Sequence, residues 1–351
     1  MRVRRFLWQA TLQRICFEHK SQTGTYSMSI MLPEQKKIMI LAVHPAGIHF
    51  AKTLVSEGFD AGAITLVLDE QRIPENHNER PSGINVVEGR CNDSSMILKV
   101  AREYGANVCC VFAWYAILKR EFIDIFNGAI FNMHFGDLPL YRGAGGFSWQ
   151  VLNGHQVLGS FVHQLTSKVD AGPVVCSVLE RIDKDEPYPA DFIQLSNRLA
   201  LCVISDFVKV ILRKNNLDVI DQSETKAEYF PKLTTAENGR INFEWGVEEF
   251  SCFVRAFSDP YPGASFVYSD NVYRARAVQI LQSALKLHPF CAGLIVNKSE
   301  LGLHVALKDG IVALRELYDD MGQRIDFDVF RIGNRLWNPA NELEKALLYR
   351  P

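Results

Sequence analysis

Three kinds of pattern are missing from this chain, and each absence argues against a class of protein. No apolar run is long enough to cross a bilayer, which argues against a membrane-spanning helix. The eight cysteines form no CxxC pair and no metal-binding spacing with histidine, so we expect neither a disulfide framework nor a metal site. A net charge of −2 gives no strong field to attract nucleic acid or an anionic membrane.

Both common phosphate-binding loops are also missing. The turn after the first apolar run holds one glycine, Gly47, where a dinucleotide fingerprint needs three, and no Walker sequence occurs. The composition itself is balanced, with 48% apolar and 22% charged residues in a chain of 351. These values predict a soluble, cytoplasmic protein with reduced cysteines and room for two domains.

The first 36 residues differ from the rest because they are basic and lack an acid before Glu18. Such a leader could be a transit peptide. The alternative is an extension from an upstream start codon, with Met28 or Met31 as the true start. We favour the extension, since the segment has no cleavage-type site of small residues.

From Lys37 onward, continuous apolar runs alternate with amphipathic segments, which predicts βαβ units and a Rossmann-like open, mostly parallel sheet. Ligands of such sheets bind beyond the carboxyl ends of the strands. We expect strands at 37–43, 63–69, 107–113 and 129–134, and helices at 48–58, 96–105, 120–126 and 190–212.

After Arg240 the pattern changes to short β-type runs separated by turns, which predicts a smaller β-rich, OB-like domain. A polar, turn-rich stretch before it predicts a linker. The expected organisation is an N-terminal extension at 1–36, an α/β domain at 37–213, a linker at 214–239 and a β-barrel-like domain at 240–351.

Unusual polar residues gather around the end of the strand at 129–134. Asn132 and His134 alternate there, so both side chains point to one face of the sheet. The glycine-rich loop LPLYRGAGG follows, and Asp170 lies in a later turn, VDAGP. An amide can stabilise a developing oxyanion, an imidazole can carry protons, and a carboxylate can orient that imidazole. Taken singly, each residue could be structural, Asn132 and Asp170 as turn caps and His134 as a buried histidine. The three together predict acyl transfer to an amine by direct attack.

These motifs resemble those of the folate-dependent formyltransferases. The resemblance rests on Asn-Met-His at 132–134, Leu-Pro-Leu-Tyr-Arg-Gly at 138–143 and Val-Asp-Ala-Gly-Pro at 169–173, and with the C-terminal segments it covers Lys37 to Leu336. It implies that Asn132, His134 and Asp170 are catalytic and that N10-formyltetrahydrofolate is the formyl donor. One departure is Phe-Gly-Asp at 135–137, where the family has Pro-Ser-Leu.

The resemblance also implies a folate pocket between two segments, 112–118 and 165–169. From the residues alone, the first segment could equally be a strand end that runs into a buried loop. The residues that we expect to contact the donor are Phe112, Ala113, Trp114, Tyr115, Ile117, Leu118, Leu165 and Val169.

The acceptor amine has two candidate classes. The C-terminal match is to the methionyl-tRNA and amino-sugar enzymes, and the loop at 69–83 carries four acids against two bases, Arg72 and Arg80. Because a tRNA site needs a basic surface, we favour a nucleotide-linked amino sugar over methionyl-tRNA. Arg142 could bind a phosphate or could pin its own turn. The expected acceptor-binding residues are Arg142, Gly143, Trp149, Tyr229 and Phe230.

A third alternative is a catalytically inactive relative that binds folate. The presence of Asn132, His134 and Asp170 together argues against it, because binding alone needs none of the three. The sequence leaves the sugar, the nucleotide and the choice between a monomer and a homodimer open.

Overall fold

The computed structural model describes residues 13–16, 29–144 and 146–348, which fold into two compact units. The first unit comprises the described residues up to Arg142 together with Val157–Arg181 and Leu195–Tyr229. The second unit comprises Gly143–Gln156, Ile182–Gln194 and the described residues from Phe230 onward.

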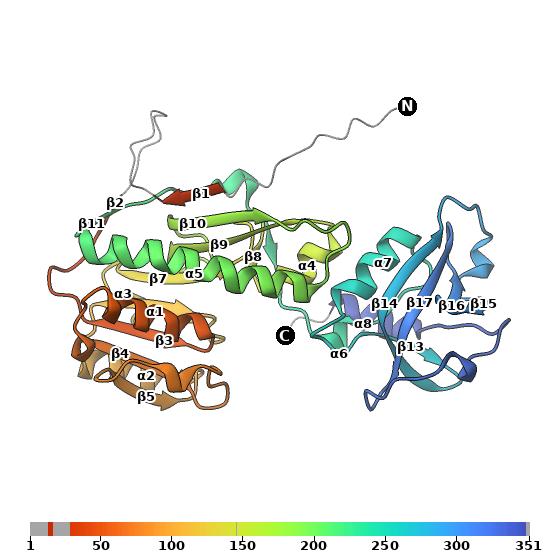
Figure 1. The fold of residues 1–351 in the computed structure, drawn as a ribbon, viewed down its shortest axis with the longest axis horizontal. Coiled ribbons are helices and arrows are strands. Elements are labelled where there is room, and N and C mark those ends of the chain that lie inside the picture. The colour runs from red at the N-terminus through yellow and green to blue at the C-terminus, as the bar shows by residue number, and fades with distance from the viewer. Residues whose placement is uncertain (1–12, 17–28, 145, 349–351) are drawn as a thin grey trace. The chain divides into compact units, whose positions relative to one another are not determined.

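The first unit is built on an eight-stranded sheet in the order β1-β10-β9-β7-β6-β3-β4-β5 (Figure 1). The strands from β7 to β5 in this order are parallel, whereas β9 is antiparallel to β7 and to β10, and β10 is antiparallel to β1. The strands are β1 (Gln13–Cys16), β3 (Ile38–Ala42), β4 (Ile64–Asp69), β5 (Asn85–Gly89), β6 (Val108–Phe112), β7 (Ile130–Phe135), β9 (Val157–Gln164) and β10 (Val174–Arg181).

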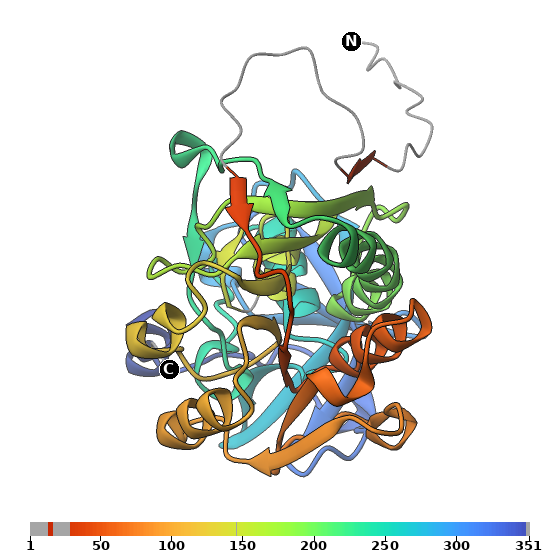
Figure 2. The same cartoon turned by 90° about the vertical axis from the view of Figure 1, so that its left-hand side faces the viewer.

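Helices cover both faces of this sheet (Figure 2). They are α1 (Pro45–Ser56), α2 (Ser94–Glu103), α3 (Arg120–Asp124) and α5 (Pro189–Arg213), of which the part from Leu195 onward belongs to this unit. Short elements of the same unit are the turns η1 (Ala61–Ala63), η2 (His77–Glu79) and η3 (Glu224–Lys226), and the strand pair β2 (Ser29–Met31) and β11 (Asn216–Asp218).

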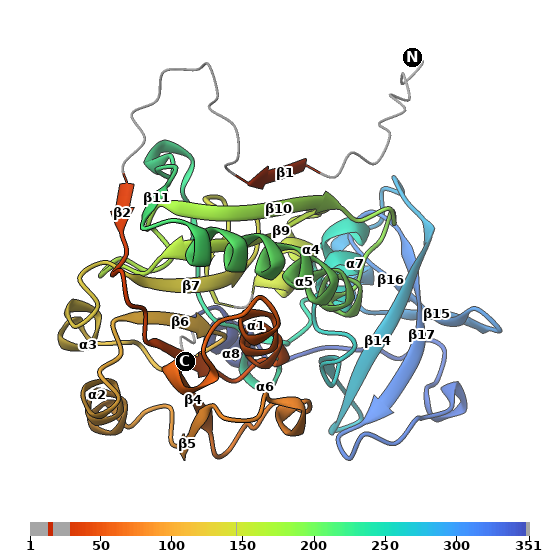
Figure 3. The ribbon, with the colours of Figure 1, turned by 60° about the vertical axis from the view of Figure 1, so that its left-hand side comes forward.

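The two cores explain why the central strands are continuously apolar. On one face, Phe50 of α1 stacks on Phe207 of α5 with ring centroids 5.7 Å apart, and Phe207 contacts Phe131 of β7. Figure 3 shows α1 and α5 side by side. On the other face, Met39 and Leu41 of β3 pack with the core that α2 and α3 cover. Since neighbouring residues of a strand point to opposite faces, a strand covered on both sides must be apolar at every position.

The fold class that the sequence predicts is confirmed, and the predicted strands and helices between residues 37 and 213 are present with slightly shifted ends. Between residues 37 and 213, three strands of this sheet were not predicted, namely β5, β9 and β10. β5 is an edge strand whose residues are only half-buried. β9 and β10 pair as antiparallel neighbours without an intervening helix, so they do not share the βαβ pattern from which the sheet was predicted.

The second unit contains a five-stranded antiparallel sheet in the order β13-β14-β17-β16-β15. Its strands are β13 (Ala264–Tyr268), β14 (Asn271–Gln282), β15 (Ile295–Ser299), β16 (Gly302–Ala306) and β17 (Ile311–Asp319). Its helices are α4 (Gly146–Leu152), α6 (Thr235–Asn238), α7 (Val247–Ala256) and α8 (Ala340–Leu348), with the turns η4 (Pro289–Cys291) and η5 (Phe327–Val329). Two-residue strands, β8 (Arg142–Gly143) and β12 (Tyr229–Phe230), stand at the borders of the units.

The segment 333–337 joins the two outer strands of this second sheet. Trp337 exchanges two backbone hydrogen bonds with Val267 of β13, at 2.7 and 3.1 Å. Leu336 donates to the carbonyl of Gly293, and Ile295 of β15 donates to the carbonyl of Asn334. The strands therefore close into the small barrel that the sequence predicts.

The predicted N-terminal extension and the predicted linker both contain short strands. The predicted extension at 1–36 lies largely outside the described residues, although β1 and β2 belong to it. The predicted linker at 214–239 contains β11, which pairs with β2. None of the helices in the described parts of the chain has the length and apolarity needed to span a membrane.

His44 connects β3 to α1 and caps the helix. Its Nδ1 accepts a hydrogen bond from the Ala46 N–H at 3.1 Å, a bond that only an unprotonated Nδ1 can accept. Burial lowers the pKa of His44 below its ordinary value of 6.5, while a hydrogen bond with Asn197 acts in the opposite direction. The folded protein therefore favours the neutral imidazole.

This geometry predicts that acid weakens the fold through His44. Because the pKa of the folded state is lower than that of the unfolded state, the stabilisation is complete above about pH 6.5 and is lost as the pH falls below it. Replacing His44 by Asn retains a good cap without a titrating group. We expect His44→Asn to flatten the decline of Tm between about pH 7 and pH 5. An equal decline in both proteins would contradict the prediction.

Candidate active site

Asn132 and His134 lie on β7, with the strand ending one residue later at Phe135. They alternate, so both side chains leave the same face of the sheet. β7 is the strand at which the sheet changes direction, since β6 runs parallel to it and β9 antiparallel. The carboxyl end of β7 lies at the edge of the sheet where ligands of open α/β sheets bind, one strand from the point between β3 and β6 at which the strand order reverses.

Asp170 reaches this strand end from the turn between β9 and β10. Its backbone has a φ of 49°, in the left-handed region that few residues other than glycine adopt. Two residues later, a Cβ on Gly172 would stand 1.8 Å from the carbonyl oxygen of Gln164. Only glycine permits this close approach, and it folds the turn tightly against the end of β9.

The structure brings the three predicted catalytic residues together. Asp170 Oδ2 lies 3.4 Å from His134 Nδ1, and Asp170 Oδ1 lies 3.4 Å from Asn132 Nδ2. The side chains of His134 and Asp170 are 9% and 12% exposed, so the carboxylate and the imidazole meet in a place largely shielded from water. Shielding strengthens the electrostatic interaction between them.

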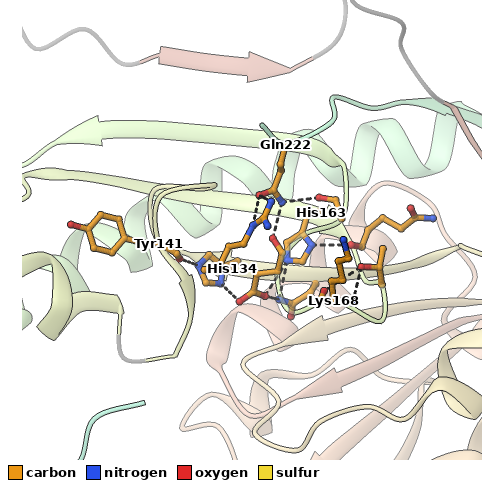
Figure 4. A network of polar contacts seen from close by, with 11 residues as sticks. His134, Tyr141, His163, Lys168 and Gln222 are labelled. Carbon is orange, nitrogen blue, oxygen red and sulfur yellow. Dashed lines mark hydrogen bonds and ion pairs between the residues drawn. The ribbon is translucent and has the colours of Figure 1, made fainter. Parts of the chain in front are cut away.

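The other nitrogen of His134 is held by the backbone. Nε2 donates to the carbonyl oxygen of Tyr141 at 2.8 Å, because a carbonyl can only accept (Figure 4). His134 therefore carries a proton on Nε2 and turns Nδ1 toward Asp170. This orientation leaves Nδ1 as the nitrogen that can gain or lose a proton.

His163 is a fourth member of this cluster, and it was not among the residues predicted from the sequence. It lies on β9 directly opposite Asn132, and its Nε2 is 3.2 Å from Asn132 Nδ2 and 3.5 Å from Asp170 Oδ1. Its Nδ1 donates to the carbonyl of Gln164, so the neutral ring accepts the Asn132 hydrogen bond through Nε2. The only sequence signal is a histidine in the strand that leads to the VDAGP turn.

Each of the two predicted folate-binding segments contains both residues packed against the core and residues exposed on the surface. Trp114, Leu118 and Leu165 pack against the core under α2 and α3. Phe112 is buried, and Ala113 has a φ of 55° that turns the chain at the end of β6. The remaining predicted residues are apolar and exposed, namely Tyr115 (54%), Ile117 (86%) and Val169 (51%).

The predicted acceptor-binding residues lie on or beside the paired two-residue strands β8 and β12. Arg142 is buried and bonded to Gln222 and Glu224, and Tyr229 is 62% exposed; both belong to the first unit. The other three, Gly143, Trp149 and Phe230, belong to the second unit, where the Trp149 indole donates to the Pro231 carbonyl and its ring contacts Phe230.

The bases of the loop at 69–83 also contact their own chain. Arg72 lies over the ring of Tyr115, with its guanidinium carbon 4.0 Å from the ring centroid. Arg80 donates to the carbonyl of His77, and the acidic Glu79 of this loop pairs with Lys52 at 2.8 Å. The loop thus presents no free basic cluster among these residues.

Sequence profiles place both halves of the chain in one family. The profile described as Formyl transferase matches residues 69–190, and Formyl transferase, C-terminal domain matches residues 233–335. The chain is also similar to a methionyl-tRNA formyltransferase from Pseudothermotoga lettingae. The two are 29% identical over 221 residues, which cover 62% of this chain and 69% of the relative.

Solved structures share the fold at low sequence identity. An N-formyltransferase from Helicobacter canadensis, in complex with folinic acid and dTDP-3-aminofucose, matches with a TM-score of 0.62 and 15% identity over 80% of this chain and 99% of the other. The sugar 3N-formyltransferase WlaRD, in the presence of dTDP and 5-N-formyl-THF, matches with a TM-score of 0.60 and 14% identity over 84% and 99%. From both profiles, the sequence relative and the shared fold, this chain is an enzyme of the formyltransferase family.

Proposed function

We propose that this enzyme moves a formyl group from N10-formyltetrahydrofolate to the amine of a nucleotide-linked amino sugar, with Asn132, His134 and Asp170 as catalytic residues. The observation that carries the proposal is the contact of these three side chains at the end of β7. They provide an amide donor, an imidazole and a carboxylate, which are the groups that transfer of an acyl group to nitrogen requires.

The residues present fit a folate donor on two counts. Tyr115 and Ile117 follow the end of β6, and Val169 directly precedes Asp170. All three leave apolar surface exposed, which suits a flat aromatic ligand. The indole N–H of Trp114 is buried and has no acceptor among the described residues, so it can donate to the polar edge of such a ligand. When bound, N10-formyltetrahydrofolate supplies the formyl group on a nitrogen that accepts a proton as the group departs.

Asn132 acts as the donor to an oxygen that gains negative charge. One Nδ2 hydrogen is held by His163 at 3.2 Å, which fixes the direction of the amide. The other faces Asp170 Oδ1 at 3.4 Å, a long contact that a substrate oxygen can replace. A single donor of this kind lowers the barrier by about 3 kcal/mol.

His134 and Asp170 act together on protons. Because Nε2 is committed to the Tyr141 carbonyl, protons enter and leave through Nδ1, which faces Asp170 at 3.4 Å. The pair takes the proton that the attacking amine loses and returns one to the departing nitrogen, so no proton is gained or lost overall. The carboxylate balances the charge while His134 is protonated.

Charge supports an amino sugar over tRNA as the acceptor. Arg72 and Arg80 contact their own loop and its neighbours. In residues 230–348 there are 13 Lys and Arg against 15 Asp and Glu, so this part of the chain has no net positive charge to attract a phosphate backbone. A sugar nucleotide presents two phosphates and so needs few cations.

Methionyl-tRNA remains the second candidate acceptor, because the sequence relative at 29% identity carries that name. The decisive experiment compares formylation of dTDP- and UDP-linked 3- and 4-amino sugars with that of initiator methionyl-tRNA at equal enzyme concentration. We expect kcat/KM for the preferred sugar to exceed that for the tRNA by about 100-fold or more.

The salt dependence of acceptor binding tests the same choice of acceptor independently. With a sugar acceptor, the slope of log affinity against log salt should be no steeper than about −2, since each phosphate contact contributes roughly −0.9. Efficient turnover of the tRNA with no sugar accepted would overturn the acceptor and leave formyl transfer in place. Folate binding without turnover of any acceptor would instead support an inactive relative.

A further inference from the structure

Gln222 makes two kinds of hydrogen bond at once beside the cluster of Asn132, His134 and Asp170. Its Nε2 donates to the carbonyl oxygens of Asp170 at 2.7 Å and of Gly172 at 2.8 Å. Its Oε1 accepts from Nε and Nη2 of Arg142 at 3.1 and 3.0 Å (Figure 4). Since carbonyls only accept and a guanidinium only donates, these partners fix which end of the amide is which.

Gln222 bonds a backbone turn, Asp170–Gly172, that contains a strained residue. Asp170 has a φ of 49°, and such a conformation costs about 1–3 kcal/mol when the residue is not glycine. The Gln222 amide bonds both the strained residue and the residue two positions later, and so bridges the turn. A bridge of this kind fixes the direction in which the Asp170 carboxylate leaves the backbone.

Arg142 connects this bridge to His134. It is 7% exposed and pairs with the exposed Glu224, whose carboxylate lies 2.9 Å from Nη2, and the hydrogen bond from Arg142 lowers the pKa of Glu224. The residue before Arg142 is Tyr141, whose carbonyl accepts from His134 Nε2. Arg142 is therefore connected to both partners of His134. It follows Tyr141 directly in the chain, and Gln222 links its guanidinium to the backbone of Asp170.

We propose that Gln222 is a positioning residue that, together with Arg142, sets the distance and angle between Asp170 and His134. The proposal rests on the proposed roles of these two residues in formyl transfer. Gln222 lies in the segment that the sequence predicts as a linker. That segment thus provides a hydrogen-bonded support for the catalytic turn, and Arg142 serves this support rather than a substrate phosphate.

Glutamine is the side chain that these contacts require. Leucine has a similar size but can neither donate to the two carbonyls nor accept from Arg142. Glutamate keeps the contact with Arg142 but places a carboxylate oxygen against two carbonyl oxygens, with no donor between them. Lysine could donate but could not accept. Gln222→Leu therefore removes both halves of the support, whereas Gln222→Glu removes only the donation to the two carbonyls.

The test uses the full-length protein with formyl-tetrahydrofolate and the acceptor that the substrate comparison identifies. We expect Gln222→Leu and Gln222→Glu to lower kcat by about 10–100-fold, because displacing a catalytic group by 1 Å costs about that much. KM for either substrate should change less than about threefold, since a residue that only positions others leaves substrate binding unchanged. The acid side of the pH–rate profile should shift in both variants, which loss of stability alone would not cause.

Asn85→Leu is the matched control. The Asn85 amide also donates to two backbone carbonyls, those of Gly62 and Ile64, but at the opposite edge strand of the same sheet. Its loss should affect Tm without changing kcat or the pH–rate profile. If Gln222→Leu behaves in the same way, Gln222 is merely structural and the proposal is wrong.

An NMR titration of His134 separates this proposal from the proposed function. In the absence of substrates, both Gln222 variants should move the titration midpoint of the His134 ring away from that of the unaltered protein, whereas Asn85→Leu should not. An unchanged midpoint would overturn the positioning role even if the enzyme formylates an amino sugar. A shifted midpoint in a protein that formylates no acceptor would retain it while the proposed function fails. If Gln222→Leu does not fold, Gln222→Glu carries the same measurements.

Discussion

His134→Ala is expected to lower kcat for formyl transfer by about 10²–10⁴-fold, which is the range that a lost general acid–base group produces. The variant removes the nitrogen that faces Asp170 and leaves the carboxylate without its partner. Because the Tyr141 carbonyl also loses its donor, Tm should fall modestly, by the equivalent of about 1 kcal/mol. Steady-state kinetics and thermal unfolding of the same preparations check both parts.

His304→Ala provides the control for this variant. His304 lies on β16 of the second unit, where its Nε2 contacts the Ser299 hydroxyl at 2.8 Å, and it has no part in the proposed mechanism. Its kcat should stay close to that of the unaltered protein. Near-normal turnover by His134→Ala with the true acceptor would show that His134 does not carry the proton.

Two substitutions of Asp170 should give equal losses of activity but unequal losses of stability. Asparagine adopts the left-handed conformation of Asp170 at a lower cost than alanine does. Both remove the negative charge that faces His134 Nδ1. We expect Asp170→Asn and Asp170→Ala each to lower kcat by about 10²–10⁴-fold, with a larger drop in Tm for Asp170→Ala.

The comparison distinguishes the charge of Asp170 from its backbone. If Asp170→Asn retained most of the turnover while Asp170→Ala lost it, the residue would act through the shape of its turn and not through its carboxylate. That outcome would contradict the proposed proton transfer between His134 and Asp170. A calorimetric measurement of unfolding for both variants shows how much of each loss comes from stability.

Local sequence patterns were sufficient to predict four of the five parallel strands, β3, β4, β6 and β7, but not the edge strand β5. Buried strands such as β3 and β6 are apolar at every position because helices cover both faces, and this pattern is visible in the sequence. The same regularity predicts that Asn132 and His134 share a face of β7, which places two of the cluster's residues. Asp170 was found through its turn residues and the resemblance.

The remaining parts of the site depend on long-range pairing that leaves no local pattern. His163 joins the cluster only because the register of β9 against β7 sets it opposite Asn132. Gln222 reaches Asp170 across 52 residues of sequence, from a polar stretch whose composition indicates a linker. Arg142 illustrates the same limit, since a buried arginine bonded to Gln222 and Glu224 has the same sequence context as one that binds phosphate.

The closure of the second unit's barrel has a consequence for self-association. The outer strands of a sheet, here β13 and β15, would otherwise offer rows of unpaired N–H and C=O groups on which another chain could add a strand and aggregate. The segment 333–337 forms backbone hydrogen bonds with β13 and with the residues at the start of β15. It therefore occupies some of the edge N–H and C=O groups of both strands. Local opening of these five residues would therefore expose two aggregation-prone edges together.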